Sequence, residues 1–164
     1  MIREVDIKDA KQIADIYKYY VENSTATFET VPLSEEEFAS KINKFKNNYP
    51  WLVYEEEGKV IGYAYAAKFK EKPAYNTTVE LTIYFHKDYC KKGYGKELSI
   101  ALFEELKKYP YYLAYVCITY PNIPSQKLTE SLGFECVGIF KNIGRKNGQW
   151  LSVIDYIKPI KEFD

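Results

Sequence analysis

The stretch of sequence that decides the fold is YFHKDYCKKGYGKEL, residues 84–98. A predicted strand ends within it, a loop with two glycines follows, and a predicted helix begins near Gly95. Gly93 and Gly95 permit a tight turn, and the helix behind the turn presents free backbone N–H groups and a partial positive charge. A helix start of this kind binds phosphate. The stretch also adds three lysines to the expected site, Lys91, Lys92 and Lys96.

A Gly-x-Gly pattern is a weak signal on its own. An ordinary strand-to-helix turn with solvated lysines explains the same residues equally well. The choice between a phosphate site and a plain turn therefore depends on the rest of the chain.

Hydrophobic periodicity predicts an α+β fold with the element order β-α-α-β-β-β-α-β-α-β-β. Helices are predicted over 9–23, 34–47, 95–108 and 124–133, and strands over 2–5, 51–54, 59–68, 77–85, 112–119, 134–141 and 150–157. Hairpin turns are expected at Glu57-Gly58 and Asn147-Gly148. The strand-helix-strand succession over 77–119 implies one parallel pair. We therefore expect a mixed, mostly antiparallel seven-stranded sheet flanked by about four helices.

Composition narrows the class of protein. The chain has 164 residues, and we expect a single domain over 1–164. Lys+Arg and Asp+Glu number 23 each, and this zero net charge argues against a nucleic-acid-binding protein. No stretch approaches the roughly 18 apolar residues of a membrane helix, and the first residues do not resemble a signal peptide. We expect no membrane association.

Cysteine and histidine usage is sparse. Three cysteines, Cys90, Cys117 and Cys136, form an odd count, so we expect free thiols and a cytoplasmic location. The chain has one histidine, His86, and no Cys-x-x-Cys pair, so we expect no metal site.

Glu80 is the candidate catalytic residue. It is the one charged residue of the strand predicted over 77–85, where Val79 and Leu81 face one way and Glu80 the other. An ionisable group in a central strand is either paired or functional. Asn122 and Ser125 lie at a second strand-to-helix junction, which is next to the first if the two strands are parallel. Simple helix capping is the alternative explanation for both.

With these residues in place, the sequence resembles the GNAT acetyltransferase superfamily. The family signature Gln/Arg-x-x-Gly-x-Gly/Ala is filled by CKKGYG, residues 90–95, except at its first position. Other segments resemble the phosphinothricin acetyltransferase subgroup, in the right order over almost the whole chain. They include ATFE (26–29), YPWLV (49–53), GYAYA (62–66), TVE (78–80), LGF (132–134) and GQW (148–150).

The resemblance implies the GNAT fold and transfer of an acetyl group from acetyl-CoA to a small primary amine. The pantetheine arm of acetyl-CoA is expected to lie along the backbone of Ile83, Tyr84 and Phe85 as an added strand. Asn122 and Ser125 are expected to make further contacts with the cofactor. The pyrophosphate is expected on the loop and helix start, at Lys91, Lys92, Gly93, Tyr94, Gly95 and Lys96.

The resemblance and simple acid–base chemistry together assign Glu80 a role. An amine attacks a thioester only when neutral, whereas an alkylammonium loses its proton near pH ~10. We expect Glu80 to take that proton, directly or through water. A backbone N–H near Phe85 is expected to stabilise the tetrahedral oxyanion.

For the acceptor, the subgroup acetylates the amine of phosphinothricin, methionine sulfoximine or methionine sulfone. Lys70 and Lys72 stand where relatives often have arginine, and we expect them to hold the acceptor carboxylate through a single-point contact. An ordinary solvated loop explains these lysines equally well. Phe28 and Tyr75 are expected to pack on the acceptor. The resemblance further implies a homodimer.

Two positions depart from the family pattern. Cys90 replaces the Gln/Arg of the signature. Thr129 stands where many GNAT enzymes have a tyrosine that protonates the leaving thiolate, and where phosphinothricin acetyltransferases have a histidine implicated in catalysis. Two alternatives therefore stay open. The chain is a GNAT enzyme for another amine, such as a polyamine, an aminoglycoside or a protein N-terminus, or it is a non-catalytic acyl-CoA-binding module.

Overall fold

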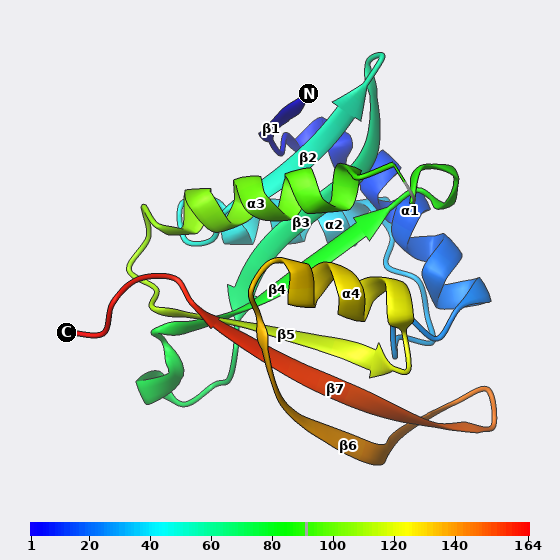
Figure 1. Ribbon diagram of the computed structural model, residues 1–164. Coiled ribbons are helices and arrows are strands. Elements are labelled where there is room, and N and C mark those ends of the chain that lie inside the picture. Colours follow the sequence, from blue (N-terminus) through cyan, green and yellow to red (C-terminus); the bar gives the residue numbers. More distant parts are fainter. Residues whose placement is uncertain (91) are drawn as a thin grey trace.

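The computed structural model describes residues 1–90 and 92–164. Its centre is a seven-stranded sheet with the strand order β1-β2-β3-β4-β5-β7-β6 (Figure 1). Every neighbouring pair is antiparallel except β4 and β5, which are parallel, so the predicted mixed sheet is confirmed. The strands are β1 (Ile2–Glu4), β2 (Trp51–Glu56), β3 (Lys59–Lys68), β4 (Thr78–Phe85), β5 (Leu113–Tyr120), β6 (Glu135–Lys146) and β7 (Gln149–Pro159).

The helices cover both faces of the sheet. In Figure 1, α3 and α4 lie in front of it, and α1 and α2 lie behind it. The helices are α1 (Ala10–Asn23), α2 (Glu35–Phe45), α3 (Tyr94–Leu106) and α4 (Ile123–Ser131), with short 3-10 turns η1 (Ile7–Asp9), η2 (Pro73–Tyr75) and η3 (Lys87–Tyr89). In the described part of the chain, no helix is both long enough and apolar enough to cross a membrane.

Local sequence explains where these elements begin and turn. The Ser34 side chain accepts from the backbone N–H of Glu37, whose carboxylate accepts from the N–H of Ser34, so a capping box starts α2 as predicted. Both predicted hairpin turns are confirmed, with positive φ at Glu57 and Gly58 and at Asn147 and Gly148.

The prediction for β6 was too short. The strand was expected to end at Lys141, but it continues to Lys146. Its pairing with β7 is interrupted between Phe140 and Gly144, where Asn142 has a φ of 55°. Strand prediction depends on the alternation of side chains, and a bulge of this kind interrupts that alternation, although the pairing of β6 with β7 resumes beyond it.

Two cores lie on opposite faces of the sheet. The front core packs Leu98, Leu102 and Leu106 of α3 against Val79 and Phe85 of β4. The rear core is aromatic and holds much of the tyrosine-rich composition. It places Phe38, Trp51, Tyr63 and Tyr65 beside the apolar faces of α1 and α2. Alternation along β4 therefore sends odd-numbered side chains to the front and even-numbered ones to the rear.

The sheet opens between its two parallel strands. Of the described residues, β4 and β5 pair at three positions, which end with Glu80 opposite Tyr115. Beyond that point β4 stays paired with β3 as far as Phe85, and β5 stays paired with β7 as far as Tyr120. The two strands diverge in Figure 1, and α4 crosses in front of the gap. We call this gap the β4–β5 opening.

The loop between α1 and α2 is fastened to the far end of the β6–β7 hairpin. The buried ammonium of Lys146 donates to the carbonyl oxygens of Ser24 and Thr27 at 2.8 and 2.9 Å. The Thr119 hydroxyl donates to the Thr25 carbonyl at 2.6 Å. These bonds hold the middle of the loop, where Phe28 packs against Gly144 of β6.

Gly62 of β3 offers a test of this packing. A Cβ added there would lie 2.5 Å from the Phe85 ring, which is too close for any real contact. We expect Gly62→Ala to lower the free energy of unfolding by about 1–3 kcal/mol, because the ring must move within a close-packed core. Urea unfolding measures the change. Gly138→Ala in β6 is the matched control, since a Cβ there meets nothing within 4 Å. Equal effects of the two substitutions would contradict the packing.

Candidate active site

Glu80 lies where the sheet opens. It occupies the last paired position of β4 before the β4–β5 opening, and its side chain is half-buried on the rear face. Burial raises the pKa of Glu80, the negative charge of Asp155 raises it further, and the positive charge of Lys41 acts in the opposite direction. A carboxyl with a raised pKa at a gap in a sheet suits proton transfer near neutral pH.

The backbone of β4 presents polar groups to the opening. The His86 N–H donates to the Ile61 carbonyl at 2.8 Å, which places the even-numbered residues of β4 in the hydrogen-bonded positions of the ladder with β3. The N–H and C=O groups of Ile83 and Phe85 therefore point towards the opening, as does the Leu81 carbonyl. The Leu81 N–H instead faces the Tyr115 carbonyl in the last pair with β5. The Phe85 carbonyl accepts a hydrogen bond from the Tyr20 hydroxyl.

Of the three strand residues expected at the cofactor, Ile83 and Phe85 thus turn their backbone to the opening. The backbone of Tyr84 belongs to the ladder with β3. Its side chain lies on the rear face, with its ring centroid 5.2 Å from that of Tyr17.

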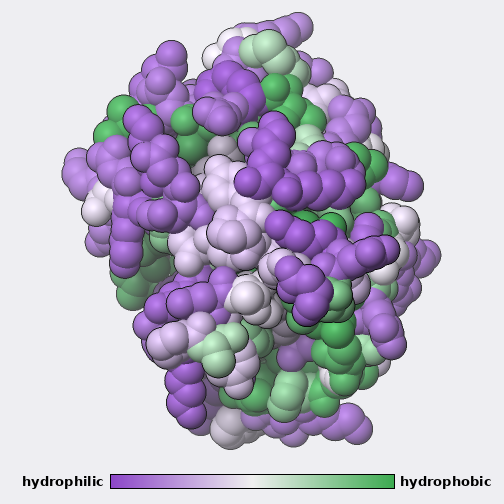
Figure 2. Space-filling model, turned by 90° about the vertical axis from the view of Figure 1, so that its left-hand side faces the viewer, coloured by the Kyte–Doolittle hydropathy of each residue, from purple (hydrophilic) through white to green (hydrophobic). Residues whose placement is uncertain are grey.

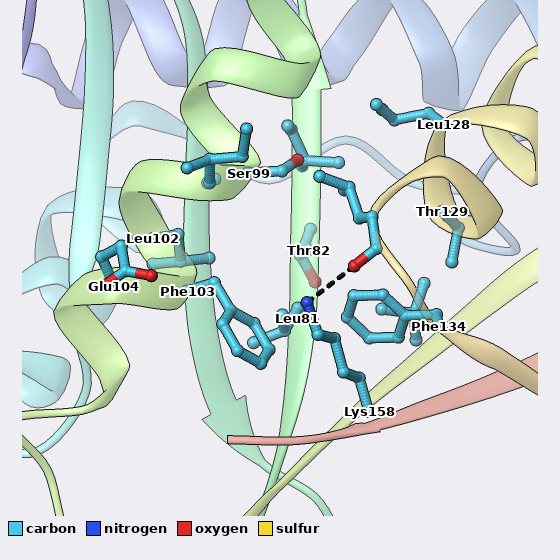
Figure 3. Close-up of a pocket in the computed structure, with 15 residues that line it drawn as sticks. Leu81, Thr82, Ser99, Leu102, Phe103, Glu104, Leu128, Thr129, Phe134 and Lys158 are labelled. Atoms are coloured by element: carbon cyan, nitrogen blue, oxygen red, sulfur yellow. Dashed lines mark hydrogen bonds between the residues drawn. The ribbon is translucent and has the colours of Figure 1, made fainter. Parts of the chain in front are cut away.

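A cavity of about 120 Å³ lies in front of the opening. Figure 3 shows its walls: α3 with Ser99 and Phe103 on one side, α4 with Leu128 and Thr129 on the other, and β4 between them. Lys158 of β7 closes one end and donates to the Leu132 carbonyl at 2.7 Å, the dashed line in Figure 3. Most of the other residues that line the cavity are apolar. They include Leu81, Ile83, Leu102, Val116 and Phe134.

The start of α3 lies at the far end of β4. Gly93 precedes the helix with a φ of 79°, and it has no side chain that could cap the first N–H groups. Among the described residues, no atom would lie within 4 Å of a Cβ at Gly93, so the described part of the chain leaves space above the helix start. Gly95 permits close packing, since a Cβ there would lie 3.4 Å from a methyl group of Leu128 in α4.

The other residues expected at the phosphates differ in how far they can contribute to the site. Lys92 and Lys96 are exposed, and the ammonium of Lys92 lies 5.2 Å from the centroid of the Tyr89 ring. The Tyr94 side chain turns away from the loop and donates to Glu56 at 2.8 Å, so only its backbone can contribute. Lys91 lies outside the described residues.

Cys90, which replaces the Gln/Arg of the family signature, points back towards the end of β4. Its sulfur lies 3.2 Å from the Tyr20 hydroxyl and 3.5 Å from the His86 carbonyl oxygen. The thiol therefore helps to fix the loop to α1.

The second junction begins α4. Asn122 is the N-cap, and its side-chain oxygen accepts from the Ser125 N–H at 3.4 Å. Both residues thus have the capping arrangement, and α4 begins beside the opening. Thr129, further along α4, is buried and lines the cavity.

The residues expected to bind the acceptor approach the rear face from two loops. Phe28 is 38% exposed and packs on Gly144. The Lys70 ammonium lies 5.4 Å from the centroid of the Tyr75 ring, which is 39% exposed. Lys72 is exposed on the same segment, directly before η2.

Three residues near Glu80 were missed by the sequence analysis. Lys41 of α2 donates to the Tyr65 hydroxyl at 2.8 Å, and Tyr115 of β5 donates to Asp155 of β7 at 3.0 Å. A signal for Asp155 existed, because it is the one charged residue in the strand predicted over 150–157. Nothing in the sequence brings Lys41 to this face, since the relative placement of α2 is a tertiary feature.

Within residues 1–90 and 92–164, no three His, Cys, Asp or Glu side chains gather closely enough to hold a metal ion.

Comparison with known proteins agrees with this geometry. The family model described as "Acetyltransferase (GNAT) domain" matches residues 2–154. The phosphinothricin N-acetyltransferase of Streptomyces viridochromogenes is 35% identical over 93% of this chain and 83% of its own. An L-methionine sulfoximine/L-methionine sulfone acetyltransferase of Pseudomonas paraeruginosa is 31% identical over 93% of this chain and 90% of its own.

A solved structure extends the likeness to three dimensions. The phosphinothricin acetyltransferase of Sinorhizobium meliloti, in complex with acetyl-CoA, superimposes with a TM-score of 0.92 at 35% identity. The match covers 97% of this chain and 87% of that protein. The match of the family model over residues 2–154 and these identities show that this chain belongs to the GNAT acetyltransferase family.

Proposed function

We propose that this protein transfers the acetyl group of acetyl-CoA to the amine of a small amino acid or amino-acid analogue. The observation that carries the proposal is the position of Glu80, a half-buried carboxylate at the point where β4 and β5 part. Relatives named for phosphinothricin and for methionine sulfoximine and sulfone support this acceptor class.

The residues present fit acetyl-CoA, which supplies an activated acetyl group. The free space above Gly93 and the uncapped N–H groups of α3 suit the pyrophosphate. The Ile83 carbonyl and the Phe85 N–H, which have no partner in β5 among the described residues, suit the amides of the pantetheine arm, as an added strand in the opening. Lys92 and Lys96, and Asn122 and Ser125 at the start of α4, complete the proposed cofactor contacts.

Glu80 acts in the proposal as the general base. It accepts a proton from the acceptor ammonium, directly or through one water, and so produces the neutral amine. Because burial raises its pKa, the Glu80 carboxylate is a stronger base than an exposed one. Activity is expected to fall as the pH drops through that raised pKa, since the protonated carboxyl cannot accept a proton.

The backbone N–H that serves the reacting carbonyl is better assigned to Ile83 than to the region of Phe85. Phe85 lies five residues beyond Glu80, roughly 16 Å along the strand, and Ile83 lies three residues beyond it, roughly 10 Å. The Ile83 N–H is the first one past the last pair with β5 that points into the opening. We propose Ile83 as the oxyanion donor.

The proposed acceptor site lies behind the opening. Phe28 and Tyr75 provide aromatic walls, and Lys70 and Lys72 provide positive charge for a carboxylate. Thr129 cannot supply a proton to the leaving thiolate at neutral pH. A thiolate leaves without protonation more readily than an alkoxide, so turnover does not require an acid at this position.

We also propose the domain organisation, the cellular location and the partners of the protein. We infer a single domain that works in the cytoplasm, supported by the thiols of Cys90, Cys117 and Cys136, none of which forms a disulfide in the described structure. The balance of 23 basic and 23 acidic residues supports an enzyme without a nucleic-acid partner.

We further propose a homodimer formed through β6. This strand is at the edge of the sheet, and five apolar side chains at or near it are between 42% and 61% exposed. They are Val137, Ile139, Phe140, Ile143 and Trp150. An exposed apolar edge strand is a pairing surface. The face shown in Figure 2 is instead largely hydrophilic, with hydrophobic side chains in separate areas.

Glu80→Gln tests the catalytic proposal. We expect turnover at neutral pH to fall about 10²–10⁴-fold, with partial recovery at high pH where the acceptor amine loses its proton unaided. Release of the CoA thiol measures turnover over a panel of free amino acids, their sulfones and sulfoximines, and polyamines. Glu162→Gln, at an exposed position, is the control. A normal rate in Glu80→Gln at every pH would remove Glu80 from this role. Acetyl-CoA binding without turnover of any amine by the wild type would favour a binding module.

Gly93→Ala tests the phosphate site. Both Gly93 and Gly58 have left-handed backbone, with φ of 79° and 76°, and neither has an atom near its missing Cβ. Alanine at either position carries a similar strain of about 1–2 kcal/mol. We expect only Gly93→Ala to weaken acetyl-CoA binding, by about tenfold, measured by calorimetry at a temperature where both variants are folded. Equal affinities in the two variants would argue against the site.

Phe140→Glu tests the dimer. A charge placed in the proposed interface should shift the protein towards the monomer in sedimentation equilibrium, because a buried charge without a partner is unfavourable. Ile7→Glu adds the same charge at a residue of η1 that is 49% exposed, and it should leave the association unchanged. A wild-type protein that sediments as a monomer would refute the proposal.

A further inference from the structure

Asp155 shares the rear face of the sheet with Glu80. Glu80 of β4 pairs with Tyr115 of β5, and Cys117, two residues further along β5, pairs with Asp155 of β7. Paired residues, and residues two apart in a strand, lie on the same face. Three adjacent strands therefore gather Glu80, Tyr115, Cys117 and Asp155 around the end of the β4–β5 opening.

A chain of contacts runs from Asp155 to the segment expected to bind the acceptor. The Tyr115 hydroxyl donates to Oδ1 of Asp155 at 3.0 Å. The Tyr115 ring packs edge-on against Phe69 with their centroids 4.7 Å apart, and Phe69 packs in the same way against Tyr75 at 5.6 Å. The Lys70 ammonium lies over both the Phe69 and Tyr75 rings.

The charges around Glu80 come from several elements. Lys41 of α2 contributes a positive charge that lowers the pKa of Glu80, and Asp155 of β7 contributes a negative charge that raises it. Burial raises the pKa of Cys117 of β5 to about 11, so this thiol is neutral. Burial also raises the pKa of Tyr115, which stays a neutral hydrogen-bond donor. Tyr65 of β3 faces the same side, with its hydroxyl bonded to Lys41.

We propose that Asp155 is a positioning residue of the acceptor site, which fixes the Phe69–Tyr75 segment through Tyr115 and places a second negative charge beside Glu80 for the acceptor ammonium. This inference rests on the proposed function and deepens it. The acceptor enters as a cation attracted by both carboxylates. Its N–H bond then breaks, and the proton moves to Glu80.

Two substitutions separate the roles of charge and packing. Asp155→Asn removes the charge but keeps an oxygen that accepts from Tyr115. Tyr115→Phe removes the hydroxyl but keeps the ring and the charge of Asp155. Asp164→Asn is the matched control, because Asp164 also accepts from a tyrosine hydroxyl, that of Tyr112, at 2.8 Å at the exposed C-terminus.

Two measurements compare the variants with the wild type. The first is the pH profile of kcat/KM with the best acceptor of the panel, together with the acceptor KM. The second is the rate of trypsin cleavage after Lys70, which follows the mobility of the segment and needs no activity. In Asp155→Asn we expect the acid limb of the profile to move about half a unit to lower pH, because Glu80 loses a like-charged neighbour. The acceptor KM should rise about fivefold, equal to ~1 kcal/mol.

In Tyr115→Phe we expect cleavage after Lys70 to become about two- to tenfold faster, the loss expected for one hydrogen bond, and the acceptor KM to rise. The acid limb should not move to lower pH, because Asp155 keeps its charge. The proposal is overturned if Asp155→Asn matches Asp164→Asn in both acid limb and KM, or if Tyr115→Phe leaves cleavage unchanged. If the wild type acetylates no amine, the proposed function fails, and the cleavage rates still decide whether Asp155 and Tyr115 position the segment.

Discussion

The structure depends on the separation of β4 and β5 after Glu80. Parallel strands in one sheet normally stay paired, and the unpaired backbone they would otherwise leave is costly when buried. Here each strand is held by a different neighbour, β4 by β3 and β5 by β7, and each of these ladders continues past the point of separation. The opening is therefore a stable part of the fold, and its free N–H and C=O groups are available to a ligand with a matching set of amides.

The alternation of residues along β4 explains why the proposed cofactor and acceptor sites lie on opposite faces of the sheet. Odd-numbered residues of β4 turn their backbone to the opening and their side chains to α3, where Val79 and Phe85 join the front core. Even-numbered residues turn their side chains to the rear face, where the charges of Lys41 and Asp155 act on Glu80. Alternate residues of β4 thus supply backbone groups suited to the cofactor and the Glu80 side chain suited to the acceptor.

The fold and the centre of the site could be predicted from the sequence, whereas the surroundings of the site could not. Glu80 stood out because a lone charge in an apolar strand is unusual, and the start of α3 stood out because Gly93 and Gly95 surround a helix boundary. Such signals are local. The charge of Lys41 comes near Glu80 only through the packing of α2 on the sheet. Asp155 comes near it across two strand pairings, Glu80 with Tyr115 and Cys117 with Asp155, which join residues 35 and 38 positions apart. The bulge at Asn142 was missed because it breaks the pattern that strand prediction requires.

The charged side chains on the two faces of the sheet favour different ligands. On the front side, the lysines at the start of α3 are exposed beside uncapped N–H groups and favour an anionic ligand. On the rear side, the carboxylates of Glu80 and Asp155 favour the cationic end of an acceptor, and Lys70 and Lys72 are the proposed partners of its anionic end. An acceptor ammonium and a CoA phosphate would therefore be drawn to different faces. They approach one another where β4 and β5 separate, which is the position that Glu80 occupies.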